Sequence, residues 1–267
     1  MRKTYQELEF KDAFMFAAVM SDAESCRGVL ERILGIPIRK VMVHAEHVLF
    51  VNPEIRDVRL DVYADDEHGT VYNVEMQTTD NKNLPKRSRY YQGQMDMTAL
   101  KTGKDFARLP QSIVIFICTF DPFGEGRHIY TFCNTCQENT ALTLDDDAVK
   151  IILSTKGTMD DVSPEMKRIL DYIDGKGASD KFTEELEEAV RSARQNERWR
   201  LDYMTLEYEY RQRYLEGKEE GREEGRAEGR ERTIQKLHER GESIASIADI
   251  VELNEEEVKR VISKLKL

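Results

Sequence analysis

The chain of 267 residues has few of the features that mark secreted, fibrous or membrane-spanning proteins. It contains six prolines, four cysteines and one tryptophan. So few prolines argue against a proline-rich linker. No apolar run approaches the roughly 18 residues of a transmembrane helix, and residues 1–7 (MRKTYQE) lack the apolar stretch of a signal peptide. We therefore expect a soluble, cytoplasmic protein without a membrane partner.

A disulfide framework is not expected, because disulfides are rare in intracellular chains of this size. The four cysteines are Cys26, Cys118, Cys133 and Cys136. The last two form a Cys-x-x-Cys motif, but no second ligand pair lies at zinc spacing. We interpret them as ordinary thiols in a loop that follows a strand. A redox or metal role for this motif is the alternative.

Basic residues do not dominate the chain. Lys and Arg number 40 and Asp and Glu number 51, which gives a formal net charge of −11. This balance excludes a globally basic nucleic-acid binder. It does not exclude a locally basic groove, because binding depends on the field at the site. Charged residues make up 34% of the chain, against about 25% in an average domain, so the excess must lie on solvated helices or a tail.

The composition changes near residue 155. Before it, runs of aromatic and β-branched residues alternate with turns, which is typical of a domain with both helices and strands. We expect two helices within residues 10–34 and a third over 85–101. Ser21 or Asp22 caps the second helix and Gly35 ends it. The expected strands are residues 40–50, 55–63, 70–78, 112–120, 127–133 and 149–153.

After residue 155 the strand signals stop, and Glu, Arg, Lys and Leu dominate. We expect a helix over 164–173, a long charged helix that starts at Thr183, and two short helices in 243–265. The sequence therefore predicts three parts. They are a mixed α/β domain over 1–155, a charged helical extension with a Gly-rich repeat over 156–240, and a small two-helix unit over 241–267.

Asp61 and Glu75 are the candidate catalytic and metal-binding residues. They lie 14 residues apart on successive predicted strands, so antiparallel pairing can bring their carboxylates side by side. Gln77 projects from the same face as Glu75, because strand side chains alternate. Two carboxylates with room for water suit Mg²⁺. The alternative is a solvated sheet face that carries acids without a function.

The most basic stretch of the chain follows this pair. Residues 80–108 contain seven basic and three acidic residues. The candidate DNA-binding residues on its predicted helix are Lys86, Arg87, Arg89 and Tyr90. The cations can hold a phosphate backbone, and Tyr90 and Tyr91 can pack on sugar or base. Phosphodiester hydrolysis needs a metal beside such a helix, because the metal activates water and stabilises charge on the phosphate.

The segments RLDVY at 59–63 and VEMQ at 74–77 together resemble the PD-(D/E)xK nuclease core. The variant is that of the Rpn-like recombination-promoting nucleases, also called PD-(D/E)xK nuclease family transposases. The resemblance extends over nearly the whole length. It includes DAFMF at 12–16, RSRYYQ at 87–92, FICTFDPF at 116–123 and the Glu-Gly-Arg repeat near the C-terminus.

This resemblance implies a restriction-endonuclease-like αβββαβ core with a long helical C-terminal extension. It also implies a DNA endonuclease that depends on Mg²⁺ or another divalent cation and acts in DNA recombination or mobile-element transposition. Asp61 and Glu75 match the metal-binding acids of the family, and Gln77 occupies the position where the broader superfamily has Lys. Asp12 lies near the place of an additional acid in that superfamily and is a possible accessory acid.

Two positions depart from the superfamily pattern. Leu60 precedes Asp61 where the pattern has proline, which contributes backbone shape rather than chemistry. Gln77 replaces a Lys whose charge can stabilise the attacking water or the phosphate, whereas a neutral amide only orients groups by hydrogen bonding. The family it resembles carries Glu-x-Gln itself. We therefore expect modest turnover, or a metal and Arg89 that supply the missing charge.

Glycine recurs every four residues at Gly217, Gly221, Gly225 and Gly229. Each glycine inside a helix costs roughly 1 kcal/mol, so an isolated helix with this row is weak. One interpretation is a solvated, partly frayed stalk. The other is a helix-pairing surface, in which the glycines allow close backbone approach and stripes of opposite charge set the register. The second interpretation predicts a homodimer through the C-terminal helices, over residues 183–240.

Residues 243–265 resemble a small helix-turn-helix. A DNA-reading unit of this kind contacts bases with the start of its second helix. Here that helix starts with Glu255, Glu256 and Glu257, which phosphate would repel but which suit a helix N-terminus. We therefore favour protein contact or simple capping over DNA reading.

Two other functions compete with metal-dependent DNA cleavage. A nucleophilic hydrolase is disfavoured, because the five histidines and four cysteines form no recognised nucleophile motif. The non-enzyme alternative is a catalytically weak or inactive nuclease-fold module that binds DNA or a protein. Gln77 in place of Lys keeps this alternative open.

Overall fold

The computed structural model describes residues 3–44, 48–49, 58–59, 61–100 and 102–264. The chain divides into two compact units, Met1–Tyr203 and Met204–Leu267. The first unit contains the sheet and every candidate site residue. Leu60, where the superfamily pattern has proline, lies outside the described residues.

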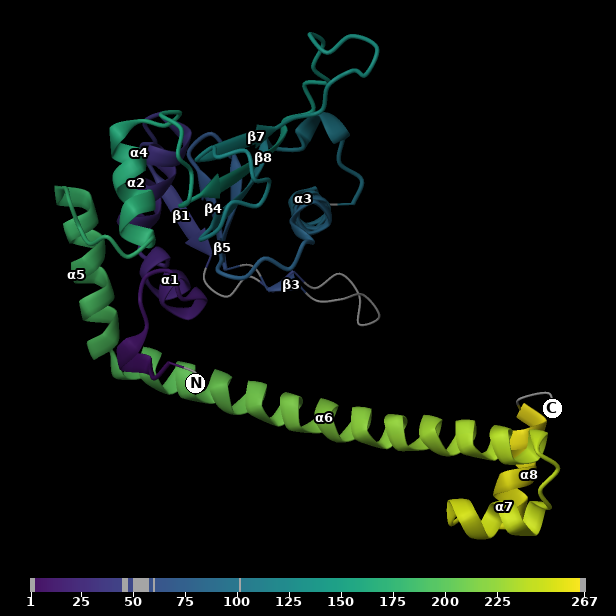
Figure 1. Ribbon diagram of the computed structural model, residues 1–267. Coiled ribbons are helices and arrows are strands. Elements are labelled where there is room, and N and C mark those ends of the chain that lie inside the picture. The colour runs from purple at the N-terminus through teal and green to yellow at the C-terminus, as the bar shows by residue number, and fades with distance from the viewer. Residues whose placement is uncertain (1–2, 45–47, 50–57, 60, 101, 265–267) are drawn as a thin grey trace. The chain divides into compact units, whose positions relative to one another are not determined.

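Unit 1 is built on a six-stranded mixed sheet with the strand order β1-β4-β5-β6-β8-β7 (Figure 1). Its strands are β1 (Val41–His44), β4 (Val62–Asp66), β5 (Val71–Gln77), β6 (Ser112–Cys118), β7 (Ile129–Phe132) and β8 (Ala148–Ser154). The central strands β5, β6 and β8 are parallel, and the outer pairs β1–β4, β4–β5 and β7–β8 are antiparallel.

The strand predicted over 40–50 is two strands in different sheets. Its first part is β1, and its second part, β2 (Val48–Leu49), pairs with β3 (Val58–Arg59) in a separate two-stranded sheet. The strand predicted over 55–63 is likewise divided between β3 and β4, and most of its first half lies outside the described residues.

Helices cover both faces of the main sheet, which confirms the predicted α/β class (Figure 1). Helices α1 (Ala13–Met20), α2 (Ala23–Leu34) and α4 (Pro164–Ile173) lie on one face, and α3 (Leu84–Ala99) lies on the other. Two short 3-10 helices are η1 (Tyr5–Glu7) and η2 (Phe106–Arg108).

The predicted end signals of α2 and α4 are confirmed. The side chain of Asp22 caps α2 by accepting a hydrogen bond of 2.8 Å from the Ser25 amide. Gly35 ends α2 with a φ of 68°, in the left-handed region that favours glycine. Helix α4 begins at Pro164 and ends at Ile173, as the sequence predicts.

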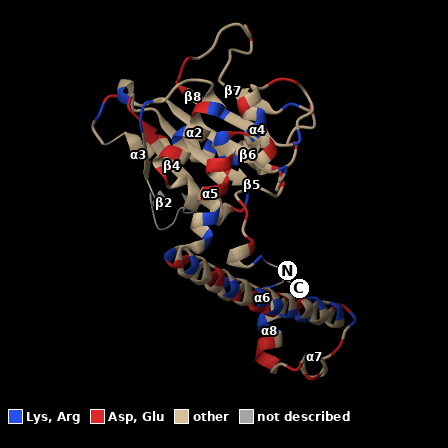
Figure 2. Ribbon diagram, turned by 90° about the vertical axis from the view of Figure 1, so that its left-hand side faces the viewer, with Lys and Arg blue, Asp and Glu red and all other residues tan. Residues whose placement is uncertain are grey.

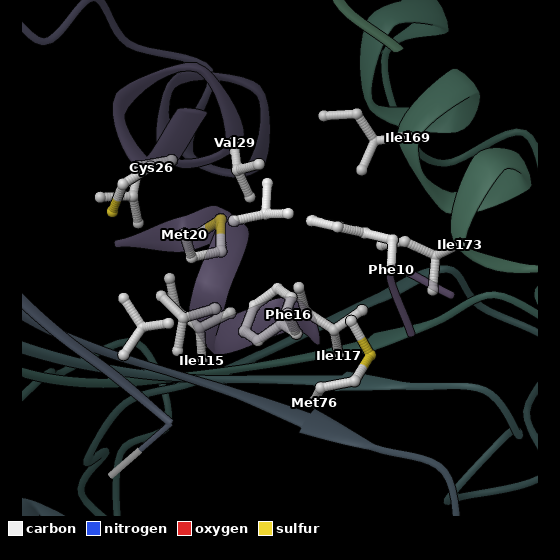
Figure 3. Packing of buried hydrophobic residues seen from close by; sticks show 14 of the residues in the cluster. Phe10, Phe16, Met20, Cys26, Val29, Met76, Ile115, Ile117, Ile169 and Ile173 are labelled. Atoms are coloured by element: carbon white, nitrogen blue, oxygen red, sulfur yellow. The ribbon is translucent and has the colours of Figure 1, made fainter. Parts of the chain in front are cut away.

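The larger core lies between the sheet and α1, α2 and α4 (Figure 3). Phe16 from α1 packs with Met76 of β5 and Ile117 of β6 in this layer. A smaller core beneath α3 contains Met95 and Phe116. Burial of apolar area, worth about 25 cal/mol per Å², therefore fixes the sheet between two helical layers and sets the position of α3 over its strands.

The prediction of one long charged helix from Thr183 is wrong, because this segment forms two helices. Helix α5 (Lys181–Gln195) is capped by Asp180 and ends before Asn196, and α6 (Glu197–Glu239) starts after that residue. Leu186 and Val190 are buried in the larger core, so α5 belongs to unit 1. The three-part division of the chain at residues 155 and 240 stays a prediction.

The N-terminal segment is tied to this far part of unit 1. The hydroxyl of Tyr5 donates to the carbonyl of Ala193 at 2.5 Å. The guanidinium of Arg194 donates to the carbonyl of Leu8 at 2.7 and 2.9 Å. Hydrogen bonds between residues almost two hundred positions apart thus hold the N-terminal segment against the end of α5.

Unit 2 contains the rest of α6 together with α7 (Ile244–Val251) and α8 (Glu255–Lys264), and the two predicted terminal helices are confirmed. They pack on the end of α6 around the small apolar core Ile234, Ile247, Ala248, Val251 and Val258. Within the part of the chain that the structure describes, no helix combines the length and the apolar content needed to cross a membrane.

The glycine row lies within α6. Around Gly217, Gly221, Gly225 and Gly229, an added Cβ atom would meet nothing within 4 Å. Acidic and basic residues are interleaved along the same helix (Figure 2). In the single chain, the row is therefore an open strip of backbone on a helix of mixed charge.

Candidate active site

Asp61 and Glu75 lie side by side, as their spacing predicts. Val62 of β4 pairs with Val74 of β5, so the two acids occupy adjacent positions at one end of this antiparallel pair. The backbone amide of Asp61 donates to Glu75 Oε1 at 3.1 Å, and the amide of Met76 donates to Asp61 Oδ2 at 3.0 Å. Each acid thereby accepts a hydrogen bond from the main chain beside the other acid.

Glu75 is deeply buried, with 3% of its surface exposed. Burial, followed by the negative charge of Asp61, raises the pKa of Glu75 to about 8, against the opposing effects of the Asp61 amide, the Arg87 guanidinium and the Asn73 side chain. The carboxyl group thus favours its protonated form. A cation placed between the two acids would reverse this preference, because opposite charge favours the carboxylate.

Gln77 shares this site through Arg87. The guanidinium of Arg87 donates from Nη1 to Gln77 Oε1 at 2.6 Å and from Nη2 to Glu75 Oε2 at 3.4 Å. The amide nitrogen of Gln77 donates to the carbonyl of Thr79 at 2.5 Å. The two bonds of the Gln77 amide hold it so that its oxygen faces the guanidinium of Arg87.

Arg87 is held in the site from helix α3. Its Nη2 also donates to the hydroxyl of Tyr91 at 3.1 Å. The guanidinium lies over the rings of Tyr91 and Phe116, at 5.4 and 5.2 Å from their centroids. Tyr91 itself stacks on Phe116, with 6.0 Å between centroids and an interplanar angle of 17°. Arg87 and Tyr91 are therefore part of the wall of the acid site.

The structure does not place Arg89 against the acids. Arg89 is exposed on α3 and, among the described residues, forms no hydrogen bond or ion pair with the acids, whereas Arg87 contacts Glu75 directly. The helical period explains the difference, because residues two positions apart face different directions. The spacing of Arg87 and Tyr91, one helical turn apart, was the sequence signal that these two side chains share one face of the helix.

The other DNA-binding candidates lie on the solvent side of α3. Lys86, Arg89 and Tyr90 are all exposed, at the end of the helix that also carries Arg87. Asp12 lies elsewhere. Its carboxylate accepts hydrogen bonds from the Lys3 ammonium and the Glu9 amide, both at 2.7 Å, at the start of α1 on the opposite face of the sheet. The structure thus does not bring Asp12 to the acid pair.

The residues present fit a hard divalent cation. Among the described residues, no group of three or more His, Cys, Asp or Glu side chains could enclose a metal ion. Mg²⁺ does not need such a cage, because it usually keeps several waters and binds one or two carboxylates plus phosphate oxygens. The side-chain amide of Asn73, on the same strand as Glu75, is buried and forms no hydrogen bond of normal geometry in the described part of the chain. Two carboxylates beside an unsatisfied amide match that chemistry.

Among the described residues, no cysteine forms a hydrogen bond with Asp61, Glu75 or Gln77. Burial raises the pKa of Cys26 and of Cys118 to about 12, so both remain thiols at neutral pH. Cys133 is exposed and Cys136 is half-buried, in the segment between β7 and β8. This location agrees with ordinary thiols in a loop after a strand.

Comparison with known proteins addresses the family of the chain. The sequence pattern of one family, described as PD-(D/E)XK nuclease family transposase, matches residues 15–153. This range contains Asp61, Glu75, Gln77 and Arg87. No curated protein and no solved structure matches the chain. The family match covers more than half of the sequence and the whole acid site, and the chain therefore belongs to the PD-(D/E)XK nuclease family transposases.

Proposed function

We propose that the chain is a divalent-metal-dependent DNA endonuclease that acts in recombination or mobile-element transposition. The observation that carries the proposal is the arrangement of Asp61 and Glu75. Each carboxylate accepts a hydrogen bond from the main chain beside the other, and Arg87 lies against the pair. The family supports a nuclease-like function, and this geometry supports the metal dependence and the phosphodiester substrate.

Asp61 and Glu75 would hold the metal. Bound there, Mg²⁺ would lower the pKa of a water molecule and neutralise charge on the phosphate. Glu75 must be ionised for this role, although burial favours its protonated form. The Asp61 amide that donates to Glu75 Oε1 supports the ionised form, so part of the cost of ionisation is already offset.

Arg87 supplies the positive charge that Gln77 lacks. In the superfamily pattern a Lys follows the Glu by two positions, and here Arg87 reaches that place from α3 and binds the Gln77 amide. An Arg side chain stays protonated throughout the usual pH range. Arg87 therefore stabilises negative charge on the phosphate and cannot act as a general base.

The exposed face of α3 would bind the DNA backbone. Lys86 and Arg89 present two cations on the solvent side of α3, and Tyr90 offers a ring for contact with sugar or base. Such contacts hold the duplex without reading its sequence. They support nucleic acid as the substrate despite the net charge of −11.

The C-terminal helices support a homodimer. Residues 211–232 contain seven acidic and seven basic residues, so two copies of this segment would not repel each other. The glycine row leaves an open backbone strip on α6, which a second helix could approach closely. A dimer would bring two acid sites to one duplex, as a double-strand cut requires.

A second candidate function is a nuclease-fold module that binds DNA or a protein and cuts weakly or not at all. The observation that favours it is the deep burial of Glu75, which together with the negative charge of Asp61 raises the pKa of its carboxyl group. An acid held in this way could remain protonated and bind no metal. The terminal helices would then serve as a binding unit, although Glu255, Glu256 and Glu257 at the start of α8 disfavour phosphate.

Nicking of supercoiled plasmid DNA separates the two candidates. We expect the full-length protein to nick in Mg²⁺ or Mn²⁺, to stop in a chelator, and to be inactive as Asp61→Ala. DNA binding without nicking in either metal would favour the binding module. Equal nicking by the wild type and Asp61→Ala would place the chemistry outside this site.

A further inference from the structure

The side chain of Asn73 lies close enough to Glu75 to favour the ionised carboxylate, yet it forms no hydrogen bond of normal geometry among the described residues. It is completely buried, and both its amide nitrogen and its amide oxygen lack such a bond. Burying an amide without hydrogen bonds is unfavourable. A residue of this kind is expected where a ligand or a bound water completes its hydrogen bonds.

Asn73 faces the candidate active site. Side chains alternate along a strand, so Asn73, Glu75 and Gln77 of β5 project from one face of the sheet. The neighbours of Asn73 in register are Tyr63 on β4 and Val114 on β6, and both are buried. On this face of β5, Asn73 therefore belongs to the same row of polar side chains as Glu75 and Gln77.

We infer that Asn73 is a positioning residue of the metal site, whose side-chain amide holds a water molecule of the cation's hydration shell beside Glu75. The inference rests on the proposed metal-dependent function. Because the amide already interacts with the Glu75 carboxyl group, it is placed to hydrogen-bond a water molecule on a cation bound there.

An amide suits this position better than a third carboxylate. It can donate to one group and accept from another, so it can orient a metal-bound water and a ligand oxygen together. It also adds no negative charge beside Glu75, whose ionisation is already opposed by Asp61. Side chains that orient ligands in this way typically change metal affinity by 10–100-fold when they are replaced.

A purely structural role makes a different prediction. An amide without a hydrogen bond of normal geometry adds little to the stability of the strand, and a Leu of similar volume in its place removes a poorly paired polar group. If Asn73 were only a core residue, Asn73→Leu would leave metal affinity unchanged. The two roles therefore differ in metal binding, which is measurable without DNA or turnover.

The experiment is calorimetric titration of the full-length protein with Mn²⁺ in the absence of DNA. We expect Asn73→Leu to weaken Mn²⁺ binding by about tenfold or more while it melts at the same or a higher temperature without metal. We expect Asn73→Gln, which keeps the amide, to retain more Mn²⁺ affinity than Asn73→Leu.

Ser154→Ala is the matched control, because Ser154 is another fully buried polar residue, on β8 of the same sheet. It should bind Mn²⁺ as the wild type does. Wild-type affinity in Asn73→Leu, with binding lost in Asp61→Ala, would overturn the role of Asn73 and leave the metal site standing. Absence of Mn²⁺ binding in the wild type would overturn both.

Discussion

The guanidinium of Arg87 donates a 2.6 Å hydrogen bond to the side-chain oxygen of Gln77, from a helix on one layer to a strand on the next. The guanidinium of Arg87, ten positions after Gln77 in the sequence, thereby lies against both Glu75 and Gln77 of β5. The charge at this place is not lost with the superfamily Lys but delivered from α3. This relationship distinguishes Arg87 from its neighbour Arg89 and leads to separable predictions.

Substitution of either acid should abolish cleavage. Asp61→Asn and Glu75→Gln each remove an anionic metal ligand but keep an oxygen that accepts the main-chain hydrogen bonds of 3.0 and 3.1 Å. We expect no nicking of plasmid DNA by either variant, with circular dichroism and melting that show a native fold. Wild-type nicking by either purified variant would contradict the assignment of the acids.

Arg87 and Arg89 should act on different steps. Arg87→Ala removes a cation that touches Glu75 and Gln77, so we expect the cleavage rate at saturating DNA to fall by about 10²-fold or more. Arg89→Ala should leave that rate near the wild-type value, weaken DNA binding, and reduce the slope of log affinity against log salt by about one. Single-turnover cleavage and binding titrations at several salt concentrations measure both. Identical effects of the two substitutions would refute the distinction.

Gln77→Lys should rescue Arg87→Ala. A Lys at this position restores a cation on the same face of β5, beside Glu75. We expect the double variant to cleave faster than Arg87→Ala alone. Gln77→Ala should lower activity less than the acid variants do, because Gln77 orients a cation and does not ligate the metal. If the double variant were as slow as Arg87→Ala, the positive charge of Arg87 would not be the property that matters for cleavage.

The stability of the metal-free protein should fall as the pH rises from about 5 to 8. Burial and the charge of Asp61 raise the pKa of Glu75, so the folded state binds a proton that the unfolded state has released. The stabilisation is complete below the ordinary pKa and is lost as the pH rises through the raised one. The slope is at most about 1.4 kcal/mol per pH unit for one proton.

Urea denaturation across this pH range, in a chelator, measures the effect. Glu75→Gln should flatten the curve, because an amide does not titrate. Added Mg²⁺ should stabilise the wild type more at pH 8 than at pH 6, since the metal competes with the proton on Glu75. A wild-type curve that matches that of Glu75→Gln would show that Glu75 is ionised in the metal-free fold.

Self-association should depend on α6. We expect full-length protein to sediment as a dimer and a chain truncated after Tyr203 to sediment as a monomer. The truncation must keep α5, because Leu186 and Val190 belong to the core of unit 1. Replacing Gly221 and Gly225 by Ala should stabilise an unpaired helix by about 1 kcal/mol each, yet it should weaken a dimer packed on the glycine row. A full-length monomer at tens of micromolar would refute the dimer.

Local signals predicted part of this fold and site. The Asp22 cap, Gly35 and Pro164 mark helix ends through bonds and dihedral angles set within a few residues. The acid pair follows from two strands that adjoin in sequence. Leu186, Val190 and Ala193 also repeat with a helical period. That repeat was a readable sign that α5 packs into the core, and the high charge of the segment concealed it.

Other features depend on packing between layers and could not be predicted from spacing alone. Arg87 enters the site because α3 lies across the sheet with Tyr91 against Phe116, and no local pattern specifies that contact. The same holds for Asn73, whose burial without a hydrogen bond of normal geometry is a property of the packed sheet and not of the local sequence. Sequence spacing places a side chain on a face, whereas tertiary packing decides which groups it meets.

The tie between the N-terminal segment and α5 bears on how the chain acquires its structure during synthesis. Tyr5 and Leu8 are bonded to Ala193 and Arg194, so these contacts cannot form until more than two thirds of the chain has left the ribosome. Contacts between such distant residues carry a high loop-closure entropy and slow folding. Tyr5 and Leu8 can therefore make these bonds only after all the strands of the main sheet have been synthesised.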